Sequence, residues 1–262
     1  TGDIKHKFGI IEEDIISLIT NNHEKYWSHC KLIGISTHIG SQLLHLEETY
    51  NAIAVLSKLA LKIENFTNAP LEMVDVGGGL GIPYTEDEEY ISPSVYDYIK
   101  NLSQILKDNY LNHRQYNSPP KIVFEPGRIL VGRAGVFVAS VIRKKTSGKK
   151  TFVVVDGGMN DFMRPSLYQA YHRIFSKYFK VHAMENVDVV GPVCETSDQF
   201  ATECLLPKSI KSGDFIVISD TGAYGYTMAS NYNLRGRPAE IIVDNDNNLN
   251  IINPAEIWEE LR

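Results

Sequence analysis

The first half of the chain alternates between helix-type and strand-type patterns of hydrophobic residues. Helical spacing is predicted over residues 12–20, 46–66 and 95–111, and the second of these helices places Ile53, Leu56, Ala60 and Ile63 on one face. Strand-like runs cover residues 31–39, 71–76 and 121–124. This alternation indicates parallel βα units, in which functional residues gather at the carboxyl ends of the strands.

The second half has a different pattern, which begins near residue 130. Short β-like runs at residues 134–142, 152–156, 187–190, 215–220 and 239–243 are separated by turn-rich segments. We therefore expect a mostly antiparallel β domain over residues 130–262, after a βα domain over residues 1–129. Because a complete eight-stranded βα barrel needs about 250 residues, the pattern leaves open whether the first domain is a small open sheet or the back part of a barrel.

Composition and charge narrow the class of protein. The 262 residues are 43% hydrophobic and 22% charged, which is ordinary for a soluble globular protein with a real core. A net charge of −6 argues against general nucleic-acid binding, because that requires a basic face. The basic run from Arg143 to Lys150 surrounds Ser147 and Gly148, which predicts a solvated hairpin tip. No apolar run is long enough to span a membrane, and we expect no membrane contact.

The cysteines and the opening residues add two expectations. Cys30, Cys194 and Cys204 are too few and too scattered for a disulfide framework or a zinc site, so we expect a reducing, cytoplasmic setting and no metal. Residues 1–10 have neither an initiator methionine nor the pattern of a domain start, and they are typical of a loop in mid-course.

Chemically distinctive residues follow the first two predicted strands. After the first strand, His38 is either a core histidine or a flat ring that stacks on an aromatic cofactor, and Ser41 is either a helix N-cap or a phosphate donor. The second strand ends in Gly77, Gly78 and Gly79, which form either a flexible turn or a run whose N–H groups approach a phosphate closely. The spacing does not match the dinucleotide-binding pattern.

The third predicted strand ends in Glu125, Pro126, Gly127 and Arg128. One interpretation is a surface ion pair at a strand end. In the other, Arg128 binds an anionic group bidentately and Glu125 holds a proton on a heterocyclic nitrogen.

The second domain contributes further candidates. Cys194 is either an inert small hydrophobe or, in a loop with Gly191 and Pro192 and beside Glu195, a residue that transfers a proton. The remaining candidates, each of which packing alone could explain, are Arg164, Tyr168 and Tyr224.

Taken together, these motifs resemble the diaminopimelate decarboxylases, a family in the alanine-racemase-like group IV of pyridoxal-phosphate (PLP) dependent decarboxylases. The resemblance spans essentially the whole chain and rests on residues 38–42, 74–81, 125–128, 159–168, 189–195 and 222–233, in that order. It implies an α/β fold, in which the C-terminal part of a PLP-binding (β/α)8 TIM barrel is followed by a mostly antiparallel β domain. It also implies a homodimer with shared active sites.

The resemblance implies a role for each candidate. His38 stacks on the cofactor ring, Glu125 pairs with the pyridine nitrogen, and Tyr224 contacts both cofactor and substrate. Cys194, from the partner subunit, reprotonates the α-carbon. The phosphate is held by Ser41, Gly77, Gly78, Gly79, Gly127 and Arg128, and the substrate is bound by Arg128, Arg164, Tyr168 and Glu195.

The implied reaction is decarboxylation of meso-2,6-diaminopimelate to L-lysine. The distal end of this substrate carries a carboxylate and an ammonium group, and Arg164 beside Glu195 supplies the matching cation and anion. Two alternatives remain open: a related ornithine, arginine or carboxynorspermidine decarboxylase, and a PLP-fold pseudoenzyme without catalysis.

The sequence departs from the family pattern in one respect. The family's cofactor-binding lysine lies on the first barrel strand, in a stretch of the type tyrosine, alanine, any residue, lysine, and no lysine here has that context. We expect a truncated or cleaved chain rather than a natural lysine-free protein. We also expect the chain alone to be inactive, because it lacks that lysine and the strands before it.

Overall fold

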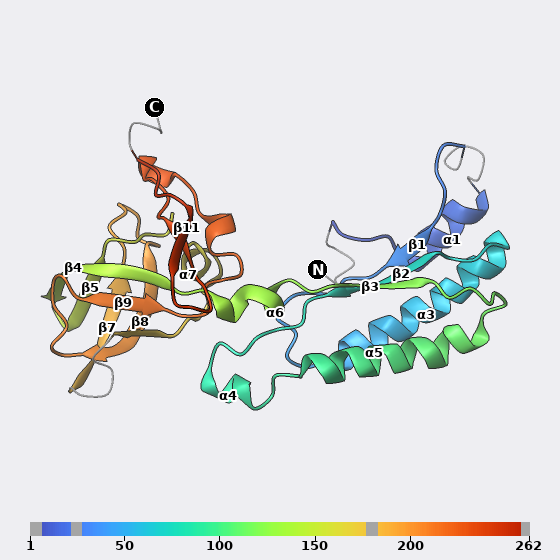
Figure 1. Cartoon of the computed structure of the whole chain (residues 1–262), viewed down its shortest axis with the longest axis horizontal. Coiled ribbons are helices and arrows are strands. Elements are labelled where there is room, and N and C mark those ends of the chain that lie inside the picture. The colour runs from blue at the N-terminus through green and yellow to red at the C-terminus, as the bar shows by residue number, and fades with distance from the viewer. Residues whose placement is uncertain (1–6, 22–27, 177–182, 258–262) are drawn as a thin grey trace. The chain divides into compact units, whose positions relative to one another are not determined.

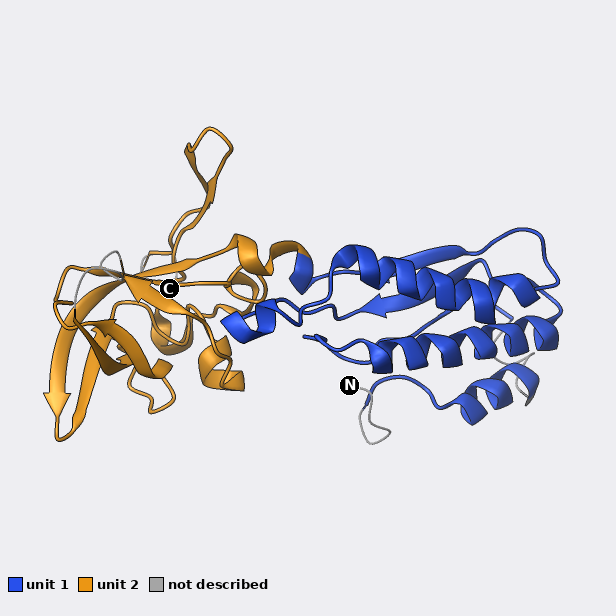
Figure 2. Cartoon of the chain, turned by 90° about the horizontal axis from the view of Figure 1, so that it is seen from below, with its two compact units in different colours: residues 1–129 blue, residues 130–262 orange. Residues whose placement is uncertain are grey.

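The computed structural model describes residues 7–21, 28–176 and 183–257, so residues 1–6 of the predicted opening loop lie outside the described residues. The chain divides into two compact units, Thr1–Ile129 and Leu130–Arg262. Figure 2 colours them separately. No helix among the described residues is both long enough and apolar enough to cross a membrane.

The first unit is built on a parallel three-stranded sheet in the order β1-β2-β3. Its strands are β1 (Gly34–Ser36), β2 (Met73–Gly78) and β3 (Lys121–Glu125). The predicted alternation of strands and helices is confirmed. The helices are α1 (Glu12–Asn21), α3 (Glu47–Thr67), α4 (Glu86–Glu89), α5 (Val95–Asn109) and the short η1 (Leu111–His113), and α6 (Arg128–Val131) follows β3.

The first strand is much shorter than the β-like run at residues 31–39 predicts. Only Gly34–Ser36 pair with β2, and the last ladder contact is the N–H of Thr37, which donates to the carbonyl of Asp75 at 3.1 Å. Beyond Thr37 the chain leaves the sheet and forms the loop that carries His38 and Ser41. The sequence predicts too long a strand here, because residues typical of strands continue after backbone pairing has stopped.

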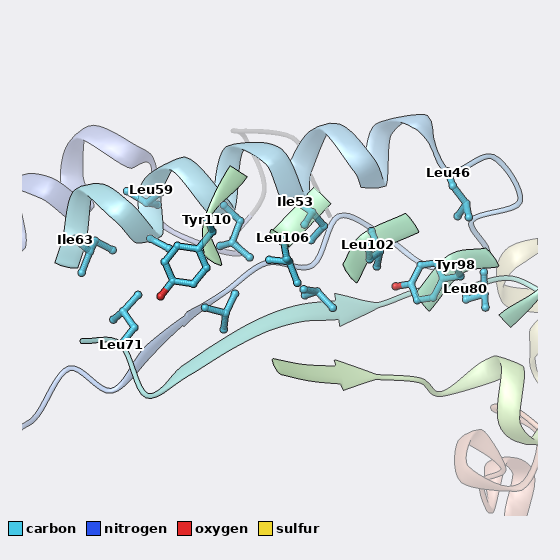
Figure 3. Packing of buried hydrophobic residues seen from close by; sticks show 14 of the residues in the cluster. Leu46, Ile53, Leu59, Ile63, Leu71, Leu80, Tyr98, Leu102, Leu106 and Tyr110 are labelled. Atoms are coloured by element: carbon cyan, nitrogen blue, oxygen red, sulfur yellow. The ribbon is translucent and has the colours of Figure 1, made fainter. Parts of the chain in front are cut away.

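The core of the first unit lies between the sheet and the helices α3 and α5, which run side by side in Figure 1. The predicted apolar face of α3 is confirmed, since Ile53, Ala60 and Ile63 are fully buried and Leu56 nearly so. Figure 3 shows Ile53 and Ile63 of α3 gathered with residues of α5 such as Leu102. Each fully buried leucine or isoleucine contributes about 1.5–3 kcal/mol, so this cluster holds α3 and α5 against the sheet.

The second unit is a six-stranded sheet in the order β6-β9-β4-β5-β7-β8, with a separate hairpin of β10 and β11. The pairs are antiparallel except for β5 with β7, which confirms a mostly antiparallel domain. The strands are β4 (Phe137–Ser147), β5 (Lys150–Val155), β6 (Ile174–Ser176), β7 (Met184–Val190), β8 (Gln199–Pro207), β9 (Phe215–Ile218), β10 (Glu240–Val243) and β11 (Leu249–Asn253).

The sequence predicts one feature of this sheet correctly and misses another. The hairpin tip is confirmed: β4 and β5 pair up to Ser147 and Lys150, and Gly148 takes a left-handed φ of 58° in the turn. In contrast, β6, β8 and β11 were not predicted. In β8, Thr202 and Glu203 are exposed and Glu203 has a φ of 50°, so the local pattern breaks where the structure keeps a strand.

Candidate functional site

The loops that follow the three parallel strands meet at one edge of the first unit. Gly78 pairs with Glu125 in the ladder between β2 and β3. The N–H of Gly78 also donates to Nδ1 of His38, at 3.4 Å. The structure therefore brings together residues of all three strand-end motifs. We call His38, Ser41, Gly78, Glu125 and Arg128 the strand-end cluster.

Three close backbone approaches explain the glycine run. A Cβ atom on Gly77 would lie 2.1 Å from the carbonyl oxygen of Thr37, and one on Gly79 would lie 2.1 Å from that of Gly40. A Cβ on Gly78 would lie 1.9 Å from the carbonyl oxygen of Glu125. Gly77 and Gly78 belong to β2 and are buried, so the flexible-turn interpretation is wrong. The glycines let the loops after β1 and β3 close against β2.

Arg128 connects two other parts of this edge. Its Nη1 donates to the hydroxyl of Tyr84 at 2.6 Å, and its Nη2 donates to Oγ of Ser41 at 3.2 Å. Arg128 is only 9% exposed, so the surface ion-pair interpretation is wrong. The N-cap interpretation of Ser41 is also wrong, because α3 begins at Glu47 with Leu46 in the capping position. A guanidinium and a hydroxyl side by side form a suitable donor set for an anionic group.

His38 and Glu125 are exposed at the strand ends, as is Gly127. The core-histidine interpretation of His38 is therefore wrong. An imidazole ring and a carboxylate that face solvent remain available to a ligand. Tyr84 was missed in the sequence; the only signal was a tyrosine soon after the glycine run, and its hydroxyl contact with Arg128 is visible only in the fold.

In the second unit, Arg164 begins the short helix α7 (Arg164–Tyr168) and is buried. Its Nη1 lies 2.9 Å from Nε2 of His172, and the Nδ1 of His172 lies 2.9 Å from the carbonyl oxygen of Ser219. Tyr168, at the end of α7, is exposed. His172 was missed because a lone histidine outside a recognised motif gives no local signal.

Cys194 lies exposed in the turn after β7. The inert-hydrophobe interpretation therefore suits Cys204 better, since burial raises the pKa of that thiol to about 11. Glu195, next to Cys194, is also exposed and accepts hydrogen bonds from the N–H of Ser197 at 3.3 Å and the hydroxyl of Thr196 at 3.2 Å. These bonds, with that from Ser197 first, lower the pKa of Glu195, so this side chain stays an anion at neutral pH.

Tyr224 has an unusual backbone conformation. Its φ is 61°, in the left-handed region that costs a non-glycine residue about 1–2 kcal/mol. The surrounding loop is fixed by hydrogen bonds from the N–H of Thr221 to Gly135 and from the N–H of Gly222 to Gly132. Strain of this kind clusters at functional sites, and the Tyr224 ring is partly exposed for contact.

Comparison with protein families gives a match over most of the chain. The family described as pyridoxal-dependent decarboxylase, C-terminal sheet domain, matches residues 24–222. The diaminopimelate decarboxylase of Campylobacter jejuni is 39% identical over 261 residues, which cover 99% of this chain and 60% of that protein. The diaminopimelate decarboxylase of Aquifex aeolicus is 36% identical over 250 residues, which cover 94% of this chain and 55% of that protein. The chain thus spans less than two thirds of the length of either relative.

Solved structures agree with these relatives. The crystal structure of diaminopimelate decarboxylase from Helicobacter pylori complexed with L-lysine aligns with a TM-score of 0.86 at 35% identity, over 100% of this chain and 61% of that chain. Lysine/ornithine decarboxylase from Vibrio vulnificus complexed with cadaverine aligns with a TM-score of 0.74 at 22% identity, over 88% of this chain and 58% of that chain, which shows a common fold only.

Proposed function

This chain belongs to the pyridoxal-dependent decarboxylase family, and we propose that it forms part of an enzyme that converts meso-2,6-diaminopimelate to L-lysine, the last step of lysine biosynthesis. The observation that carries the proposal is the strand-end cluster, in which a buried arginine and a serine hydroxyl share one sheet edge with an exposed histidine and carboxylate. In this proposal the first unit supplies part of a (β/α)8 barrel. The setting is the cytoplasm.

The chemistry of this cluster fits pyridoxal 5′-phosphate. The cofactor has an anionic phosphate, a flat aromatic ring and a basic ring nitrogen. Arg128 and Ser41 together offer donors for the phosphate, with the backbone of Gly127 and the glycines of β2 beside them. His38 offers a ring for stacking, and Glu125 offers a carboxylate for the ring nitrogen. Each part of the cofactor therefore has a partner of matching chemistry.

The bound cofactor supplies an electron sink for the bond that breaks when CO₂ leaves. Glu125 would keep a proton on the ring nitrogen, because a carboxylate stabilises the positive charge there. Cys194 would donate its Sγ proton to the substrate α-carbon after CO₂ has left. Tyr224 would orient substrate and cofactor, and its preset backbone needs no reordering to do so.

The substrate preference follows from charge. Arg164 would bind the distal carboxylate of diaminopimelate, with Arg128 and Tyr168 as further substrate contacts, and Glu195 would bind the distal ammonium. An anionic Glu195 suits that task. A pocket for a diamine product needs acid alone, so this residue set favours diaminopimelate over ornithine or arginine. We also propose a homodimer in which Cys194 serves the partner subunit's site.

The test compares two preparations, each supplied with PLP. One is the 262-residue chain alone, and the other is the same chain together with a segment that carries the cofactor-binding lysine. Release of CO₂ and formation of L-lysine from meso-diaminopimelate are expected only in the second. If ornithine, arginine or carboxynorspermidine is turned over faster than meso-diaminopimelate, that compound replaces it as the assigned substrate. If the visible absorbance shows that PLP is bound but none of these compounds is turned over, the protein is a pseudoenzyme.

A further inference from the structure

The buried carboxylate of Asp198 joins two of the motifs of the second unit. Its Oδ1 accepts a hydrogen bond from the N–H of Met159 at 2.6 Å, and its Oδ2 accepts one from the N–H of Val193, also at 2.6 Å. Asp198 is only 3% exposed. Its carboxylate thus links the segment that precedes Arg164 to the turn that carries Cys194 and Glu195.

The backbone of Asp198 closes the same turn. Its carbonyl accepts from the N–H of Gly191 at 3.0 Å, and its own N–H donates to the carbonyl of Glu195 at 3.1 Å. Within the turn, the N–H of Glu195 donates to the carbonyl of Val193 at 2.8 Å. Asp198 therefore holds the turn at its start, its middle and its end, and Cys194 lies between these points.

The space around the carboxylate explains two glycines. A Cβ atom on Gly191 would lie 2.3 Å from Oδ2 of Asp198, and one on Gly158 would lie 2.9 Å from Cγ2 of Val193. Neither position tolerates a side chain without moving the turn. The carboxylate of Asp198, seven positions later, thus explains why a glycine precedes Pro192.

The contacts require an acceptor at both oxygens of Asp198. Burial raises its pKa, and the hydrogen bonds from Val193 and Met159 and the charge of Arg235 offset this only in part, so the pKa stays above the ordinary value of an aspartate. An amide in place of the carboxylate would point an NH₂ group at one of the two N–H donors. One bond would then be lost and two donors would face each other.

We propose that Asp198 is a positioning residue, which fixes the Cys194–Glu195 turn and thereby sets where the Cys194 thiol donates its proton and where Glu195 meets the substrate. This inference rests on the proposed function for its catalytic consequence. The position of Cys194 itself is measurable without substrate.

Asp198→Asn is the test variant, and Asp188→Asn is its matched control. Asp188 is also buried in the second unit and also accepts a backbone hydrogen bond, from Glu203 at 3.0 Å, but it lies in β7 before the turn. Each variant is treated with iodoacetamide, and alkylation is followed at each cysteine by peptide mass spectrometry. Cys30 is exposed and serves as the internal reference.

In Asp198→Asn the alkylation rate of Cys194 is expected to change severalfold while that of Cys30 stays constant, and neither should change in Asp188→Asn. In the chain combined with the segment that carries the cofactor-binding lysine, turnover should fall on the order of 10²-fold, as for a misplaced catalytic group, with PLP affinity retained. Gly191→Ala displaces the carboxylate without removing its charge, so it should change the alkylation rate of Cys194 and the turnover in the same direction. It is the second test variant if Asp198→Asn does not fold.

Wild-type alkylation of Cys194 in a folded Asp198→Asn or Gly191→Ala protein overturns the inference, as does a loss of thermal stability alone. A selective change at Cys194 supports it even in a protein that decarboxylates nothing. In that case the proposed function fails while the role of Asp198 in the turn stands.

Discussion

Arg164 and His172 form a buried side-chain hydrogen bond, with 2.9 Å between Nη1 and Nε2. Because a guanidinium only donates, Nε2 must accept, and the ring proton then lies on Nδ1 and is donated to the carbonyl of Ser219. The imidazole also packs against Phe162 in a T-shaped arrangement, with ring centroids 4.8 Å apart. His172 therefore orients Arg164 as a neutral ring, since an imidazolium would place two cations together in a buried site.

Replacement of Arg164 tests the diacid pocket. Arg164→Ala should lower kcat/KM for diaminopimelate by an amount equivalent to about 2–5 kcal/mol, as for a charged pair left half-made, while PLP stays bound. Arg164→Lys should rescue poorly, because an ammonium lacks the planar two-donor fork. The measurement, made on the chain combined with the segment that carries the cofactor-binding lysine, is kcat/KM beside thermal stability. If Arg164 merely anchors the loop before Pro165, stability falls and kcat/KM of the folded protein stays near normal.

Replacement of His172 tests the orientation of Arg164. His172→Phe keeps the aromatic packing and removes the acceptor, so KM for diaminopimelate should rise by an amount equivalent to about 1.5–3 kcal/mol, the range for a hydrogen bond to a charged group. The value of kcat should change less than KM. An unchanged KM in a folded His172→Phe protein would show that Arg164 does not depend on the imidazole.

Removal of the Cys194 thiol tests proton donation. In the chain combined with the segment that carries the cofactor-binding lysine, Cys194→Ala should reduce turnover on the order of 10²–10⁴-fold, as for loss of a positioned general acid, with little effect on PLP affinity. Cys30→Ala, at another exposed cysteine, is the control and should keep wild-type turnover. Cys194→Ala subunits mixed with subunits that lack the cofactor-binding lysine should recover part of the activity. Absence of recovery in verified mixed dimers would exclude a shared site.

An alanine at Gly77, in the glycine run, should destabilise the protein more than an alanine at Gly148, in the hairpin turn. Gly148 has a φ of 58° and open space around it, so Gly148→Ala should cost only the left-handed backbone term of about 1–2 kcal/mol. Gly77 has a φ of 72° and the Thr37 carbonyl in the path of a Cβ, so Gly77→Ala should cost about 2–5 kcal/mol. Urea unfolding measures both free energies. Equal costs would mean that the loops relax freely at the strand ends.

A buried ion pair predicts the acid sensitivity of the first unit. Arg114 donates to both carboxylate oxygens of Glu64, and the hydroxyl of Tyr110 and the N–H of Leu71 donate to Glu64 as well. Burial by itself raises the pKa of Glu64, but the hydrogen bonds, that from Arg114 first, outweigh it and lower the pKa below 4.5. The stability that Glu64 contributes is therefore present above its unfolded pKa and is lost as pH falls through the folded value.

Arg114→Leu should cost about 3–5 kcal/mol at neutral pH, because it leaves a buried charge without its partner. Lys31→Ala, which breaks the exposed pair of Lys31 with Glu72, is the control and should cost at most about 1 kcal/mol. Urea unfolding from pH 6 to about pH 3 measures both variants. The wild-type protein should lose stability in this range, whereas Glu64→Gln should lose less of it.

The sequence by itself determined much of the fold. The spacing of its hydrophobic residues was sufficient to predict the parallel βα half and the buried face of α3. Its turn residues were sufficient to predict the hairpin tip at Gly148. Each of these features depends on neighbours within a few residues. The ordered motifs were sufficient for the family. Conversely, the lengths of β1 and β8 could not be read from residue type, because strand ends depend on whether a partner strand is present.

Only the tertiary structure decided how the candidate residues are held. Ser41 and Arg128 are 87 positions apart and His38 and Gly78 are 40 apart, yet each pair meets in the fold. His172 and Asp198 were not among the candidates, although His172 contacts Arg164 and Asp198 holds the turn of Cys194. Side-chain orientation depends on a hydrogen-bond partner brought near by packing, and local sequence periodicity carries no information about such a partner.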